Sequence, residues 1–130
     1  MRIGLDIGST TIKAVVFDDG NNIVFRHYER HCARINELCA SLLARIDEQF
    51  PNETFQLAIS GSAGMGLAED VGAEFLQEVY ATRVALKKMV PDADVAIELG
   101  GEDAKILFLT GAGGLEVRMN GSCAGGTGAF

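Results

Sequence analysis

The fold is decided by the opening stretch Arg2-Ile-Gly-Leu-Asp-Ile-Gly-Ser-Thr-Thr-Ile-Lys-Ala-Val-Val-Phe17. Both ends of this stretch are rich in the β-branched and aliphatic residues that strands favour, and Gly8-Ser9-Thr10 between them is a turn. A second strong turn signal, Asp18 to Asn22, precedes another strand-like run over residues 23–30. The chain is therefore expected to open with an antiparallel meander of three strands.

The remaining elements predict the fold class. Apolar residues recur at helical spacing from Ile35 to Phe50, which predicts an amphipathic helix that ends at Pro51. The elements predicted after it are a strand over 55–60, helices over 67–71 and 77–90, and strands over 95–99, 104–109 and 115–119. This order predicts an α/β fold of the ribonuclease H-like type, with a mixed sheet that begins with three antiparallel strands. Residues 1–91 are expected to form one such domain, and residues 92–130 the first strands of a second.

Composition limits the function classes. The 130 residues are 48% hydrophobic and 22% charged, which is typical of an ordered globular protein. A net charge of −7 argues against nucleic-acid binding, which needs a basic stripe. No apolar run approaches the roughly 20 residues of a membrane-spanning helix. The N-terminus lacks the apolar segment of a signal peptide, so we expect a cytoplasmic location and no membrane partner.

The cysteines and histidines carry little functional signal, with one exception considered below. Three cysteines do not make a disulfide framework. Cys32 and Cys39 are expected to be small core residues. His27 and His31 lie at the end of the third strand and are expected at the surface.

A unit that combines an acid, a glycine turn and a lysine occurs twice. Asp6-Ile7-Gly8 is followed by Lys13, and Glu98-Leu99-Gly100 by Lys105, five residues after the glycine in each case. A carboxylate at the end of a buried strand is costly unless it binds a cation or accepts hydrogen bonds. A glycine turn lets backbone N–H groups approach an anion. The pattern suits Mg²⁺ together with phosphate groups, and two such hairpins facing each other would clamp a triphosphate.

The residues around Lys13 do not fit the other common phosphate-binding motifs. A P-loop needs a lysine directly after a glycine in a loop that opens a helix, whereas Lys13 lies in a strand. A Rossmann fingerprint needs a third glycine and a following helix. A pair of strand hairpins is therefore the favoured phosphate site.

Asp6 and Glu98 are the candidate catalytic residues, and Asp6 is expected to bind Mg²⁺ through a water molecule. The residues expected to contact the phosphates are Gly8, Ser9, Thr10, Thr11, Lys13, Gly100, Gly101, Glu102, Asp103 and Lys105. Simpler roles remain open for several of them. Asp6 could cap a turn, the two lysines could extend from their strands into solvent, and Glu102 and Asp103 could be solvated turn residues.

Four segments resemble motifs of known families. Asp6-Ile-Gly-Ser-Thr-Thr11 and Ile97-Glu-Leu-Gly-Gly-Glu-Asp103 resemble the two phosphate motifs of the actin-like ATPase superfamily, which includes sugar kinases, heat-shock chaperones and actin. Met119-Asn-Gly-Ser-Cys-Ala-Gly-Gly-Thr-Gly128 is more specific and resembles the cluster-cysteine loop of the activators of 2-hydroxyacyl-CoA dehydratases. The loop Ser60–Gly66 also resembles that family. The first half of the chain is most similar to long fused proteins that join activator and dehydratase modules.

The resemblance implies a homodimeric ATPase with ATP, Mg²⁺ and a [4Fe-4S] cluster shared between subunits. Each subunit contributes two cysteines, of which Cys123 is one, and an electron passes to a dehydratase component in anaerobic metabolism. The family's second cysteine and adenosine motif lie beyond residue 130. This chain alone is therefore expected to lack both ATPase activity and a stable cluster. It departs from the family at Glu98, where Asp is usual, and at Glu102, where Gln is usual.

Two other functions remain open. An actin-like small-molecule kinase would need a catalytic Asp and a substrate pocket that the sequence does not locate. A nucleotide-responsive interaction module would bind nucleotide without turnover. The sequence does not identify the acyl-CoA that a partner dehydratase would use.

Overall fold

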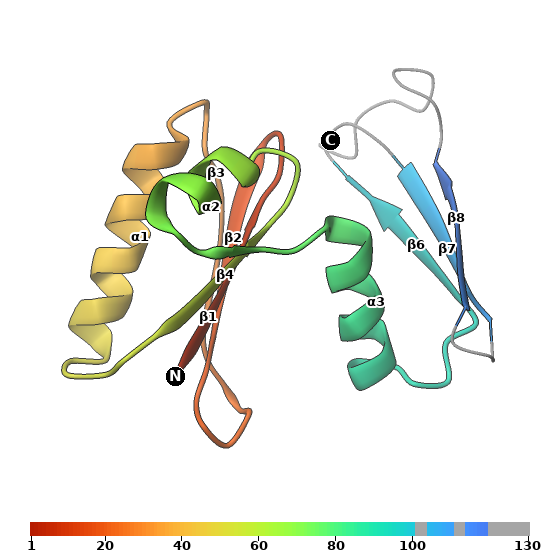
Figure 1. Ribbon diagram of the computed structural model, residues 1–130, viewed down its shortest axis with the longest axis horizontal. Coiled ribbons are helices and arrows are strands. Elements are labelled where there is room, and N and C mark those ends of the chain that lie inside the picture. The colour runs from red at the N-terminus through yellow and green to blue at the C-terminus, as the bar shows by residue number, and fades with distance from the viewer. Residues whose placement is uncertain (101–103, 111–113, 120–130) are drawn as a thin grey trace. The chain divides into compact units, whose positions relative to one another are not determined.

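The computed structural model describes residues 1–100, 104–110 and 114–119 of the chain (Figure 1). Its elements in chain order are β1 (Arg2–Ile7), β2 (Thr11–Phe17), β3 (Ile23–Arg30), α1 (Ile35–Gln49), β4 (Gln56–Ser60), α2 (Met65–Val71), β5 (Glu74–Phe75), α3 (Glu78–Met89), β6 (Val95–Leu99), β7 (Ala104–Thr110) and β8 (Gly114–Met119). Within the described ranges, none of the helices has the length and apolar character needed to cross a membrane.

The chain divides into two compact units, Met1–Gln77 and Glu78–Phe130. This division groups α3 with the later strands. The sequence instead predicts a domain boundary near residue 91, which stays a prediction.

The first unit is built on a five-stranded mixed sheet with the strand order β3-β2-β1-β4-β5. β1, β2 and β3 pair antiparallel as a meander, and β4 pairs parallel to both β1 and β5. This arrangement confirms the predicted ribonuclease H-like α/β class. The parallel pairing matters for function because it brings the carboxyl ends of β1 and β4, and the loops that follow them, to the same edge of the sheet.

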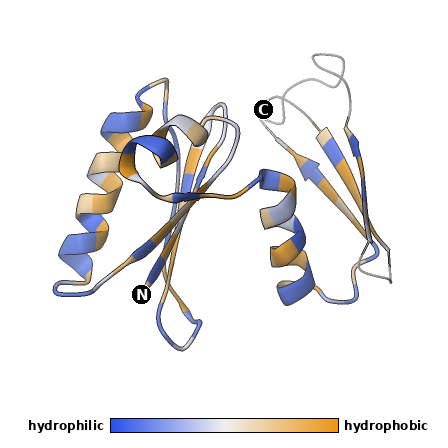
Figure 2. Ribbon diagram, viewed as in Figure 1, coloured by the Kyte–Doolittle hydropathy of each residue, from blue (hydrophilic) through white to orange (hydrophobic). Residues whose placement is uncertain are grey.

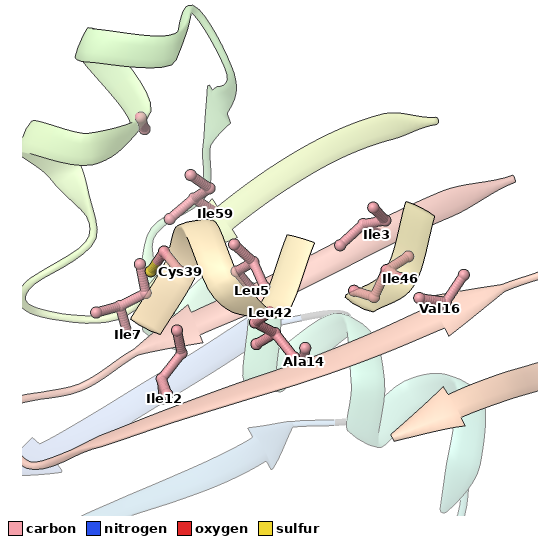
Figure 3. Close-up of a cluster of buried hydrophobic side chains, with 11 residues drawn as sticks. Ile3, Leu5, Ile7, Ile12, Ala14, Val16, Cys39, Leu42, Ile46 and Ile59 are labelled. Carbon is pink, nitrogen blue, oxygen red and sulfur yellow. The ribbon is translucent and has the colours of Figure 1, made fainter. Parts of the chain in front are cut away.

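The core of the first unit lies between α1 and one face of the sheet (Figure 3). Its buried side chains are Ile3, Leu5, Ile7, Ile12, Ala14, Val16, Cys39, Leu42, Ile46, Ile59 and Ala68. Burial of each large aliphatic side chain stabilises the fold by about 1.5–3 kcal/mol. Because side chains alternate between the two faces of a strand, this burial directs Asp6 and Lys13 to the opposite face of the sheet.

The turn between β3 and α1 departs from the sequence-based prediction. Cys32 is exposed and His31 is only 5% exposed, so the predicted burial of Cys32 and exposure of His31 were both wrong. The physical reason is the backbone, because Cys32 and Ala33 both adopt left-handed φ angles, 46° and 63°. This reversal places the His31 ring inside and the Cys32 thiol outside. The two-residue strand β5 was also missed, because it is too short to show a periodic pattern.

The second unit contains α3 and an antiparallel meander of β6, β7 and β8. β6 and β7 consist mostly of hydrophobic residues (Figure 2). Leu107 on β7 is fully buried, whereas Ile97 and Leu99 on β6 are 67% and 71% exposed. The side of β6 that carries Ile97 and Leu99 is therefore left uncovered by the described residues.

Candidate functional site

Asp6 is held near the carboxyl end of β1 by its pairing with β2. Asp6 lies directly opposite Lys13 in the antiparallel register, and the Lys13 Nζ donates to Asp6 Oδ2 at 2.6 Å. The other carboxylate oxygen, Oδ1, is buried and has no hydrogen-bond partner among the described residues. A buried carboxylate oxygen without a donor is costly. The described residues therefore leave one acceptor oxygen of Asp6 unused.

The loop after β4 closes against Asp6. Ser60, the last residue of β4, pairs with Asp6 across the parallel register, and the N–H of Ala63 donates to the Ile7 carbonyl at 2.9 Å. Gly61 has a φ of +95°, and a Cβ at this position would lie 2.6 Å from Asp6 Oδ1 and 2.3 Å from the Ile7 carbonyl oxygen. Only glycine fits here. Gly61 therefore allows the loop after β4 to pack closely against Asp6 and Ile7.

Replacing Gly61 with alanine is expected to lower the free energy of unfolding by about 3 kcal/mol, because the methyl group adds a backbone clash to a strained φ. Thermal or denaturant unfolding measures this effect. Gly66→Ala is the matched control, since a Cβ at Gly66 on α2 meets nothing within 4 Å. We expect that control to be neutral or slightly stabilising. Equal stability of the two variants would contradict the close approach of Gly61 to β1.

The turn between β1 and β2 is the predicted first phosphate turn. The N–H of Gly8 donates to the Thr11 carbonyl at 2.9 Å, so this donor is used within the turn. Ser9, Thr10 and Thr11 are each partly exposed. A phosphate group at this turn would therefore meet the N–H groups that follow Gly8 rather than that of Gly8 itself.

The second unit repeats the pairing of the first. Glu98 on β6 lies directly opposite Lys105 on β7, as Asp6 lies opposite Lys13. The Lys105 Nζ is 3.6 Å from Glu98 Oε1 and 3.0 Å from Oε2 of Glu78, the first residue of α3. The acid–lysine repeat of the sequence is thus a structural repeat with the same register.

Lys105 does not extend into solvent, because the residue is only 4% exposed. Burial raises the pKa of Glu98, an effect opposed by the charge of Lys105 and reinforced by the neighbouring carboxylate of Glu78. Glu98 Oε2 is buried without a hydrogen-bond partner in the described part of the chain. Sequence reasoning missed Glu78. Its only signal was an acidic residue at the start of a predicted helix.

The structure does not describe all of the predicted site residues. Gly101, Glu102, Asp103 and Cys123 lie outside the described residues, whereas Gly100 directly follows β6. Across residues 1–100, 104–110 and 114–119, no cluster of three or more His, Cys, Asp or Glu side chains could hold a metal ion.

The two described cysteines differ in environment. Cys39 is buried in the core, and burial raises the pKa of its thiol, which keeps the thiol protonated and poorly reactive. Cys32 is exposed, and both cysteines are free thiols. The prediction that Cys39 is a core residue is therefore confirmed.

Comparison with known proteins identifies the family. The model of the BadF/BadG/BcrA/BcrD ATPase family matches residues 3–130. The chain belongs to this ATPase family. The resemblance drawn from the Asp6, Glu98 and Cys123 motifs is thereby confirmed.

Relatives of this BadF/BadG/BcrA/BcrD family member include named dehydratase activators. The chain is 28% identical to the activator of lactoyl-CoA dehydratase from Anaerotignum propionicum, over 98% of this chain and 50% of the relative. It is 29% identical to the 2-hydroxyisocaproyl-CoA dehydratase activator of Clostridioides difficile, over 98% of this chain and 48% of the relative. The chain thus spans about half the length of these curated relatives.

A solved structure supports the same grouping. The activator of the 2-hydroxyisocaproyl-CoA dehydratase from Clostridium difficile, solved with bound ADPNP, superposes with a TM-score of 0.79 at 26% identity. That match covers 98% of this chain and 48% of the solved chain. The fold of this BadF/BadG/BcrA/BcrD family member is therefore of the actin-like ATPase type, as the sequence predicts.

Proposed function

We propose that this chain forms the N-terminal part of an ATP-dependent activator of a 2-hydroxyacyl-CoA dehydratase. One observation carries the proposal most strongly. Asp6 and Glu98 each face a cross-strand lysine at the same register, and each keeps one buried carboxylate oxygen without a partner in the described ranges. Membership of an ATPase family and similarity to named dehydratase activators support a nucleotide-binding role for this duplicated unit.

The chemistry of the two carboxylates fits a magnesium–nucleotide complex. Mg²⁺ prefers oxygen ligands and keeps most of its waters, which suits the unpartnered oxygens of Asp6 and Glu98. When bound, Mg²⁺ supplies the positive charge that offsets the phosphates and the charge developing during hydrolysis. Lys13 and Lys105 lie against the two carboxylates, and the N–H groups that follow Gly8 would face the phosphates.

The other residues predicted from the phosphate motifs belong to the same proposal. Gly100, Gly101, Glu102 and Asp103 would form the second phosphate turn, and Glu98 would position the attacking water. The Lys105 Nζ is 3.0 Å from Glu78 Oε2 and 3.6 Å from Glu98 Oε1, so Glu78 helps to fix the lysine that lies opposite Glu98.

The redox part of the proposal rests on family resemblance. The two described cysteines are poor candidates for ligands of an iron–sulfur cluster. Cys39 is buried in the core, and Cys32 is exposed with no metal-binding group of side chains around it in the described ranges. Cys123 is therefore the proposed ligand, with one copy from each subunit of a homodimer and a second cysteine from elsewhere in each subunit. A [4Fe-4S] cluster supplies one-electron chemistry when it is bound. The dehydratase is the proposed electron acceptor, and the cytoplasm the proposed location.

The full-length protein, purified without oxygen, tests the proposal. We expect Mg²⁺-dependent ATP hydrolysis together with about four irons per dimer. ATP turnover without iron, combined with phosphorylation of a small molecule, would instead support an actin-like kinase. Nucleotide binding without any turnover would support an interaction module.

The 130-residue chain alone is expected to release phosphate from ATP at a negligible rate. It spans about half of its relatives, and the apolar residues Ile97 and Leu99 are exposed on its second sheet. A malachite-green phosphate assay on the chain and on the full-length protein, at equal concentration, checks this expectation. Comparable rates would contradict the proposal that the site needs the rest of the protein.

A further inference from the structure

His31 ties the turn between β3 and α1 to the turn between β1 and β2. The side chain is almost fully buried, and its Nε2 lies 3.0 Å from the carbonyl oxygen of Gly8. The backbone N–H of His31 donates to the Thr10 carbonyl at 3.2 Å. One residue therefore contacts two carbonyls of the predicted phosphate turn, that of Gly8 through its ring and that of Thr10 through its backbone.

The second ring nitrogen determines where the proton lies. The N–H of Ala33 donates to His31 Nδ1 at 3.1 Å, so Nδ1 must be an acceptor. The ring proton is therefore on Nε2, where it is donated to Gly8. The imidazole is neutral in this arrangement, because a protonated Nδ1 would face the Ala33 N–H with a second donor.

The backbone is strained at the point that makes this arrangement possible. Cys32 and Ala33 have φ angles of 46° and 63°, a left-handed conformation that non-glycine residues adopt rarely. The N–H of Arg34 also donates to the His31 carbonyl at 2.8 Å, which closes the turn. This tight turn is what brings the Ala33 N–H onto the His31 ring. Strain of this kind is held in place only where the surroundings require it.

The consequence for the phosphate turn follows from the geometry of the peptide group. The chain has no cis peptide bonds in the described ranges, so each carbonyl points opposite to the N–H of the next residue. Because the carbonyls of Gly8 and Thr10 point to His31, the N–H groups of Ser9 and Thr11 point away from it. The orientation of both donors is thereby fixed before any ligand arrives.

We propose that His31 is a positioning residue of the nucleotide site, which orients the backbone donors of the turn at residues 8–11 through its Nε2–H bond to Gly8. This inference rests on the proposed function, because it assigns the anion at that turn to a nucleotide phosphate. A preoriented donor binds an anion without first losing backbone freedom. Loss of the His31 bond therefore weakens nucleotide binding although His31 does not itself touch the phosphate.

Three substitutions in the full-length protein separate the two ring contacts. His31→Gln keeps an N–H donor at the place of Nε2, His31→Asn keeps an acceptor at the place of Nδ1, and His31→Ala removes both. His27→Ala is the matched control, because His27 lies on β3, four residues before His31, and its Nε2 is near Glu29 rather than the phosphate turn. Binding of Mg·ADPNP is measured by calorimetry, thermal unfolding is recorded for each variant, and ¹⁵N-histidine spectra report the tautomer.

We expect His31→Gln and His27→Ala to bind Mg·ADPNP within about threefold of the wild type, and His31→Asn and His31→Ala to bind about tenfold more weakly. The wild-type spectrum should show a protonated Nε2 and a bare Nδ1. If His31→Ala does not fold, the difference in Mg·ADPNP affinity between His31→Gln and His31→Asn still tests the positioning role.

Unchanged affinity in His31→Asn, or an equal loss in His31→Gln and His31→Asn, would overturn the positioning role even where the wild type binds tightly. The opposite tautomer would overturn it as well. Failure of the wild-type protein to bind Mg·ADPNP would refute the proposed function itself, and the positioning role with it.

Discussion

Replacing Asp6 with asparagine in the full-length protein is expected to reduce Mg²⁺-dependent ATP hydrolysis by a hundredfold or more while the protein stays folded. Asparagine keeps the shape of the side chain but removes the charge that the proposed metal site needs. Loss of one electrostatic contact to a transferring phosphoryl group costs on the order of 3 kcal/mol in the transition state. Steady-state phosphate release at saturating Mg·ATP measures the loss.

The folded state should tolerate Asp6→Asn. The ion pair between Asp6 and Lys13 is partly exposed, with side-chain exposures of 36% and 41%, so its loss costs at most about 1 kcal/mol of stability. Asp19→Asn is the matched control, because Asp19 lies in the exposed turn between β2 and β3 and its side chain is 97% exposed. Normal hydrolysis in Asp6→Asn would show that Asp6 only caps its turn.

Replacing Cys123 with serine is expected to abolish the cluster of the full-length protein and its activation of the dehydratase. Thiolates are the usual protein ligands of [4Fe-4S] clusters, and a dimer with one cysteine left in each subunit supplies only half of the ligands. Nucleotide binding should persist, since the carboxylates of Asp6 and Glu98 remain. Iron content, visible absorbance and Mg·ADPNP binding are measured on the same anaerobic preparation.

Cys32→Ser provides the control for Cys123→Ser. Cys32 is an exposed free thiol, so serine in its place should change neither the iron content nor the absorbance. If Cys123→Ser keeps about four irons per dimer, Cys123 is not a ligand. The main reason to prefer an activator over a kinase would then be lost.

Much of the fold could be predicted because it depends on local patterns. The alternation of apolar residues in β1 and β2 and the helical stripe of α1 were sufficient to predict the meander, the helix and the mixed sheet. The pairing of Asp6 with Lys13 across the two strands could also be predicted from the sequence. The two residues lie equally far from the centre of a tight turn, and antiparallel strands place such residues opposite each other.

The sequence by itself thus determined the fold class, the family and the two carboxylates that stand at strand ends. Only the tertiary structure decided how these groups are held. Gly61 meets Asp6 across a parallel strand pair, Glu78 meets Lys105 from a helix, and His31 reaches back to Gly8. These contacts join residues far apart in the chain. Local periodicity carries no record of such contacts, because they form only when the packed core brings the separate elements together.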